Sequence, residues 1–276
     1  MTDGQRRATT TTPQGSQRNG DIIRPVSAET AETAGRLGVA ALALQVVGVA
    51  DDAPALRRLT VHDPRLAELP WRPGQDLTLC LPAAARSVKR RYTIRRLDRA
   101  SSTAELLVLL HEDGPGARWA AGVRAGDHLE AVGPRGKIWA DEHAGWHLFV
   151  GDETYLAATA AMAESLPAGT RALVVLQVGD DVGPQPISAA AGLQQPVWVR
   201  RNPLGAGEPG VELIDALAAL VLPDGLGHAY VGGEHHAVAA VRACLLGRGL
   251  PDDAISSKAY WRADKPNQDH GEPERD

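Results

Sequence analysis

The residues best suited to chemistry lie in a short basic segment of the sequence R-R-Y-T-I-R-R. Within it, Arg90, Tyr92 and Thr93 form an R-x-Y-T pattern, and the placing of Tyr92 and Ile94 predicts a β-strand. A guanidinium, a phenol ring and a hydroxyl on one strand match what a flavin requires: a cation for the diphosphate, a ring to stack on and donors for the polar edge. A basic edge strand that resists aggregation has the same composition, so the rest of the chain must decide between a flavin-binding strand and such an edge strand.

The length, net charge and cysteine content limit which classes of protein this chain can belong to. The 276 residues suit one large domain or two ordinary ones, and a hydrophobic fraction of 43% is ample for a core. The net charge of −5 argues against general nucleic-acid binding, although a locally basic pocket is compatible with it. The two cysteines, Cys80 and Cys244, lie far apart without a C-x-x-C, which excludes a cysteine-built iron–sulfur or zinc site and favours a reduced, cytoplasmic protein.

No segment has the pattern of a targeting or membrane element. Arg6 and Arg7 are not followed by an apolar run, so we expect no signal peptide. The apolar run over residues 37–50 is too short to span a bilayer and contains Gln45, so we expect a buried strand and no membrane insertion.

The first half of the chain predicts a barrel. Residues 1–35 are polar and predict a disordered tail. Residues 36–138 contain short apolar runs separated by turn signals, which is typical of a small antiparallel β-barrel. We expect strands over 41–49, 55–62, 76–81, 90–97, 105–111 and 127–132, with a helical turn near 116–122.

The second half changes pattern after Gly133-Pro134-Arg135-Gly136. From residue 139 to 265 strands alternate with helices, which predicts an α/β domain with an open parallel sheet, followed by a polar tail over 266–276. We expect strands over 146–150, 172–178, 196–200, 228–231 and 255–261, and helices over 153–166, 211–222 and 235–247.

Several turns could hold an anionic ligand. Parallel sheets bind ligands beyond the carboxyl ends of their strands, where the G-D-E-T of residues 151–154 and the G-G-E of residues 232–234 each precede a helix. The segment 111–119 also opens a helix after a strand, and its N–H groups suit a diphosphate. Each turn equally fits ordinary strand-to-helix geometry, and the dinucleotide pattern G-x-G-x-x-G is absent.

Taken in order, these blocks resemble the siderophore-interacting proteins, a family of cytoplasmic, flavin-dependent ferric-siderophore reductases of the ferredoxin-reductase type. The resemblance extends over about residues 40–265 and includes R-x-Y-T-x-R at 90–95, H-x-x-G-P-x-x-x-W at 111–119, G-D at 126–127, G-P-R-G at 133–136, G-D-E-T at 151–154, G-E at 233–234 and Y-W-R at 260–262. It implies an FAD-binding barrel followed by a nucleotide-binding α/β domain, in agreement with the pattern above.

The resemblance also implies roles for single residues. FAD contacts would come from Arg90, Tyr92, Thr93 and Arg95, and the diphosphate loop from His111, Gly114, Pro115 and Gly116. Residues near the nicotinamide nucleotide would be Gly151, Asp152, Glu153, Thr154, Gly233 and Glu234, while Tyr260, Trp261 and Arg262 would cover the flavin region.

The chain departs from the family's pattern on the nucleotide side. The usual G-D-E-T-A-L-P-A-I reads G-D-E-T-Y-L-A-A-T here, which places Tyr155 at an alanine position and removes the proline. Gly232 stands at the first position of the usual A-G-E, and Ala259 replaces the glycine before Y-W-R; the glycine expected shortly after it is missing.

The resemblance predicts that NAD(P)H reduces FAD, which passes electrons singly to Fe(III) in a siderophore and so releases Fe(II), which siderophore oxygens hold weakly. An anionic siderophore would be attracted by cations, for which the candidates are Lys258, Arg262 and Lys265, with Lys89 and Arg91 as further ones. No catalytic side chain beyond the flavin and no protein metal site is expected.

Two other functions stay open. The chain could reduce flavin for a protein electron acceptor, or it could bind a siderophore or nucleotide without catalysis. The sequence does not distinguish NADH from NADPH or name the siderophore, and we take a monomer as the default.

Overall fold

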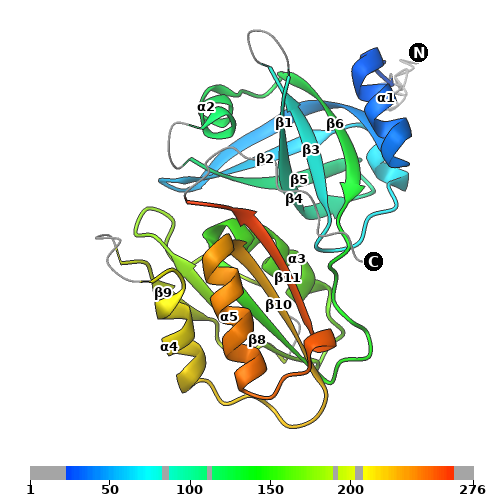
Figure 1. Ribbon diagram of the computed structural model, residues 1–276. Coiled ribbons are helices and arrows are strands. Elements are labelled where there is room, and N and C mark those ends of the chain that lie inside the picture. The colour runs from blue at the N-terminus through cyan, green and yellow to red at the C-terminus, as the bar shows by residue number, and fades with distance from the viewer. Residues whose placement is uncertain (1–22, 83–86, 111–113, 189–191, 203–207, 264–276) are drawn as a thin grey trace, which may run out of the picture.

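The computed structural model describes residues 23–82, 87–110, 114–188, 192–202 and 208–263. A closed barrel of six antiparallel strands, in the order β1-β2-β5-β4-β3-β6, precedes a parallel sheet of five strands (Figure 1). The antiparallel barrel and the parallel sheet predicted from the sequence are therefore both confirmed.

The barrel forms because apolar residues alternate along its strands and fill its interior. In β1, for example, Leu42, Leu44 and Val46 are fully buried. The helix α2 covers one end of the barrel, as the sequence predicts near 116–122. The elements are β1 (Ala40–Ala53), β2 (Leu56–His62), the 3-10 helix η1 (Pro64–Glu68), β3 (Asp76–Leu81), β4 (Val88–Asp98), β5 (Thr103–Leu109), α2 (Pro115–Gly122) and β6 (His128–Arg135).

A helix, α1 (Ala28–Leu37), lies where the sequence predicts the end of a disordered tail. That prediction is wrong for residues 28–35. Ser27 caps the helix by accepting the Thr30 N–H, and Glu130 of β6 accepts the backbone N–H and the hydroxyl of Ser27, each at 2.6 Å. A carboxylate distant in sequence thus holds α1 against the barrel. Residues 1–22 and the polar tail lie outside the described residues, and the domain boundaries stay a prediction.

The second sheet has the strand order β11-β10-β7-β8-β9, with all described pairs parallel. The helix α3 packs between this sheet and the barrel, while α4 and α5 cover the other face (Figure 1). The elements are β7 (Trp146–Asp152), η2 (Glu153–Tyr155), α3 (Leu156–Ser165), β8 (Arg171–Val178), β9 (Val197–Arg200), α4 (Val211–Ala219), β10 (Gly227–Glu234), α5 (His235–Gly247), η3 (Asp252–Ala254) and β11 (Ile255–Trp261).

The two sheets share a hydrophobic core. Ala55 and Leu56 of the barrel pack in one cluster with Tyr155 and Met162 of the second half. The barrel and the parallel sheet are therefore joined by packed apolar side chains.

Candidate functional site

The R-x-Y-T strand packs against the start of α2. A Cβ atom placed on Gly116 would lie 2.2 Å from the Tyr92 hydroxyl oxygen and 3.9 Å from Cγ of Arg90, so only glycine fits there. α2 begins with Gly114 as N-cap and Pro115 in its first turn, and no side chain caps it. The first turn of α2 therefore has no side-chain cap and begins beside the Arg90 side chain, an arrangement that suits a phosphate.

Tyr92 stays neutral in this position. Burial raises the pKa of its hydroxyl to about 12, although the Arg90 charge opposes the shift. A neutral phenol ring next to a guanidinium and a helix N-terminus provides a flat surface, a hydroxyl donor and positive charge within one small region.

Thr93 faces the opposite direction, toward the second half of the chain. It is buried, and its side chain lies near that of Tyr260 on β11. Burial raises the pKa of Tyr260 well above its ordinary value, and the neighbouring Thr93 hydroxyl opposes this shift. The predicted Y-W-R block thus reaches the predicted R-x-Y-T block across the domain boundary.

A buried carboxylate joins two of the predicted cations. Asp76 of β3 accepts two hydrogen bonds from Arg91, at 2.8 and 2.7 Å, and one from Nζ of Lys258 at 3.2 Å. The Lys258 ammonium also lies 5.5 Å from the centre of the Tyr260 ring. Two cations around one carboxylate leave a local charge of about +1, so the region remains attractive to an anion.

Arg95 is held by the second half of the chain. Its guanidinium donates two hydrogen bonds to Glu164 of α3, at 2.7 and 2.6 Å, and the two side chains are 11% and 15% exposed. This pair, which the sequence does not reveal, ties β4 to α3. Arg95 therefore lies on the α3 side of the strand.

Asp152 connects the ends of three parallel strands. Its carboxylate accepts the Thr154 N–H at 2.9 Å, the Glu234 N–H at 2.8 Å and the indole N–H of Trp261 at 2.9 Å. Gly233 has φ of +133°, and a Cβ atom there would lie 2.6 Å from an Asp152 oxygen. The structure brings these predicted nucleotide contacts together, but Asp152 is already satisfied by protein donors.

Two neighbouring carboxylates also have protein partners. Glu234 caps α5 by accepting the N–H groups of His236 at 2.6 Å and Ala237 at 2.9 Å, so its own charge occupies the helix N-terminus. Glu153 pairs with Arg201 at 2.8 Å, and burial raises the pKa of Glu153 while Arg201 opposes that shift. Arg201, whose guanidinium lies 5.9 Å from the centre of the Trp261 ring, was not predicted from the sequence.

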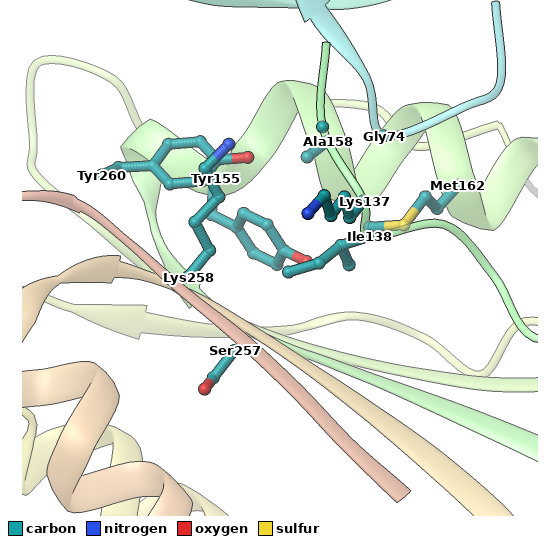
Figure 2. Close-up of a pocket in the computed structure, with 10 residues that line it drawn as sticks. Gly74, Lys137, Ile138, Tyr155, Ala158, Met162, Ser257, Lys258 and Tyr260 are labelled. Carbon is teal, nitrogen blue, oxygen red and sulfur yellow. The ribbon is translucent and has the colours of Figure 1, made fainter. Parts of the chain in front are cut away.

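A pocket opens between the two halves and encloses about 570 Å³ of space, part of it open to solvent (Figure 2). It has aromatic and apolar walls and two ammonium groups, and only Lys258 and Tyr260 among its residues were expected near a ligand. The lining residues are Gly74, Gly136, Lys137, Ile138, Tyr155, Ala158, Met162, Ser257, Lys258 and Tyr260.

Two departures from the family's pattern, of which Tyr155 lines the pocket, compensate each other. A Cβ atom on Gly232 would lie 2.2 Å from the ring of Tyr155, and one on Gly151 would lie 2.9 Å from Cβ of Tyr155. Tyrosine at 155 thus requires glycine at 232. Sequence comparison shows both departures, but only their contact reveals that they form a pair.

The remaining predicted residues are dispersed. Lys89 contacts the Thr33 hydroxyl at 3.3 Å and Glu29 at 3.6 Å, so it faces α1 instead of the pocket. Arg262 follows β11 directly, and His111 and Lys265 lie outside the described residues. Among the residues that the structure describes, no helix has the length and apolarity of a membrane span, and no three His, Cys, Asp or Glu side chains gather as metal ligands.

Known proteins with similar sequences point to one family. Residues 77–138 match the siderophore-interacting FAD-binding domain, and residues 144–264 match the siderophore-interacting protein domain. The chain is 30% identical to ferric vibriobactin reductase ViuB of Vibrio cholerae over 206 residues, which is 72% of this chain and 73% of that protein.

Solved structures with a similar fold support the same family. A siderophore utilization protein from T. fusca superposes with a TM-score of 0.73 at 29% identity, covering 84% of this chain and 96% of that one. Phthalate dioxygenase reductase shares the fold at 18% identity, with a TM-score of 0.61 over 82% of this chain and 69% of that one. With both domain matches and a relative that is aligned over most of its length, the chain belongs to the siderophore-interacting protein family, with an FAD-binding domain of that family at its N-terminal side.

Proposed function

We propose that this protein is an FAD-dependent ferric-siderophore reductase that uses NAD(P)H as its reductant and releases iron as Fe(II). The observation that carries the proposal is the cradle of Arg90, Tyr92 and Gly116, which lies within the residues that match the FAD-binding domain. The likeness to a ferric vibriobactin reductase supports the choice of substrate.

The residues of the cradle fit FAD. The uncapped N-terminus of α2 and the Arg90 guanidinium would hold the diphosphate, and Tyr92 would lie against the ring system. Thr93 faces away from Tyr92 and lies buried beside Tyr260, so we assign it no contact with this ring. When bound, FAD would supply the coupling of two-electron to one-electron chemistry that a nicotinamide donor and an iron acceptor require.

The side chains around the pocket would bind and orient the substrate. Ferric siderophores of the catecholate type are anionic, and the pocket presents Lys137 and Lys258 next to the Tyr260 ring. Asp76 holds Lys258 in place at 3.2 Å without cancelling the charge, because Arg91 shares the same carboxylate. Since siderophore oxygens hold Fe(II) weakly, reduction alone releases the metal and no protein ligand is needed.

The test is anaerobic formation of Fe(II) from a ferric catecholate siderophore, trapped by a ferrous chelator. We expect NAD(P)H to be consumed in proportion to the Fe(II) formed, with two Fe(II) for each nucleotide because a hydride carries two electrons. A Gly116→Leu variant, whose side chain overlaps Tyr92, should lose both FAD and activity. NAD(P)H oxidation that is indifferent to the siderophore but rises with a protein acceptor would contradict the proposal in favour of a flavin reductase.

A further inference from the structure

Tyr155 covers the surface where a ligand of an open parallel sheet is expected. It ends the turn η2 that follows β7, and its ring lies against Gly232 at the end of the neighbouring strand β10. Gly151 and Gly232 are paired in register across these two central strands. Ligands of such sheets bind beyond the carboxyl ends of the strands, and glycines there let a flat ring approach the backbone. Here the ring on that surface is the chain's own.

The ring of Tyr155 is held by contacts within the α/β half of the chain. Its ring meets that of Tyr260 edge to face, with centres 5.5 Å apart and planes at 89°. The side chain of Tyr260 in turn lies near that of Thr93 of the barrel. Tyr260 thus lies between the Tyr155 ring and the R-x-Y-T strand of the barrel.

The hydroxyl of Tyr155 is poorly satisfied in this position. Tyr155 is 2% exposed, and within the described part of the chain its hydroxyl oxygen has no hydrogen-bond partner. Figure 2 shows that the hydroxyl points toward Ile138, at the apolar side of the pocket. A buried hydroxyl without a partner destabilises the conformation that buries it. The conformation in which Tyr155 covers Gly232 is therefore less stable than it would be if the hydroxyl were hydrogen-bonded.

We infer that Tyr155 is a gate that competes with the nicotinamide ring of the reductant for the surface of Gly151 and Gly232. The inference rests on the proposed function, because it assumes that NAD(P)H is the electron donor. With the gate closed, the adenosine part of the nucleotide can bind along the sheet while the nicotinamide is excluded. Opening requires the Tyr155 ring to move away from the ring of Tyr260. The apparent affinity for the nicotinamide end is then lowered in proportion to the fraction of molecules in the open state.

The test compares nucleotides with and without nicotinamide on the oxidised FAD-loaded protein by isothermal titration calorimetry. NAD⁺ is measured against ADP-ribose, and NADP⁺ against 2′-phospho-ADP-ribose. In the natural protein each pair should bind with nearly equal affinity. Tyr155→Ala should strengthen binding of the nicotinamide nucleotide by about tenfold relative to its truncated partner, because the closed state is lost.

Two further variants guard against a folding defect. Tyr155→Leu removes the ring but keeps apolar volume, and it should shift the ratio of affinities in the same direction as Tyr155→Ala. Tyr155→Phe keeps the ring and removes the unbonded hydroxyl, so its ratio should stay at the natural value or fall below it. A ratio that is the same in all variants would overturn the gate.

This outcome is separable from failure of the proposed function. If the gate inference alone fails, the ratio of affinities will be the same in all variants while the protein still holds FAD and forms Fe(II). Failure of the proposed function would appear as a protein without FAD or without Fe(II) formation. If neither member of a pair binds to FAD-loaded protein, both the gate and NAD(P)H as reductant are wrong.

Discussion

The ion pair between Arg95 and Glu164 should hold the barrel and the α/β domain together. Since the side chains are 11% and 15% exposed, the pair lies between an exposed pair, worth about 0.2–1 kcal/mol, and a buried pair whose disruption costs about 3–5 kcal/mol. We expect Arg95→Ala to lower the free energy of unfolding by about 2 kcal/mol. Glu164→Ala should cost about 3 kcal/mol, because Glu164 also accepts the Ser188 N–H at 2.9 Å.

The assay is a double-mutant cycle measured by urea denaturation. Because the two side chains are in direct contact, the coupling energy should be about 1–2 kcal/mol, so the double variant loses less than the sum of the single variants. Arg96→Ala is the matched control: Arg96 is a neighbour on β4, its side chain is 58% exposed and it lies 3.8 Å from Glu164, so we expect a change within about 0.5 kcal/mol. A coupling energy near zero would show that the ion pair between Arg95 and Glu164 does not hold the two halves together.

The same variants decide between two roles for Arg95. If Arg95 serves only to form the ion pair with Glu164, Arg95→Ala and Glu164→Ala should both change the dissociation constant of FAD only slightly and to a similar extent. If Arg95→Ala alone weakens FAD binding about tenfold, its guanidinium serves the FAD phosphates, as the resemblance to the family implies.

Three further predictions concern the pocket and the core of the α/β domain. Gly232→Ala should lower the midpoint of thermal unfolding, because its Cβ would lie 2.2 Å from the Tyr155 ring, and the same substitution should cost little in a Tyr155→Ala background. Replacing Lys258 and Arg262 with Gln should raise KM for an anionic ferric siderophore several-fold with an unchanged flavin spectrum; an unchanged KM would remove both from the substrate site. Burial lowers the pKa of His147 below 6.5, so the unfolded chain takes up a proton that the folded one resists. The free energy of unfolding should therefore fall as the pH drops through about 6.5, and less so in His147→Gln; equal urea profiles would contradict this.

Much of the fold could be predicted because each strand of the chain carries its own pattern. Alternating apolar residues such as Leu77 and Leu79 mark a barrel strand, and the continuous apolar run before Gly151 marks a buried parallel one. The helix α1 was missed because its anchor, Glu130, lies about a hundred residues away in the chain, although Ser27 as a cap and Gly38 as a terminator give a local signal.

The site was harder to predict because its residues act through partners on other strands. Motif spacing located Asp152, but not that three strand ends would satisfy its carboxylate. Lys258 was identified as a cation near the ligand, yet Asp76, which holds it, has no sequence signal of its own. Tyr155 stood out only as a departure from a pattern. Its contact with Gly232 depends on the register of β7 and β10, which spacing along the chain does not specify.

The central claim is tested most directly by the visible absorbance spectrum of the purified protein during stepwise anaerobic addition of reductant and substrate. The account predicts a flavin spectrum that bleaches with NADH or NADPH and returns when ferric siderophore is added, as Fe(II) appears. A colourless protein that cannot be reconstituted with FAD would contradict it, and would leave a non-catalytic binding protein as the better description.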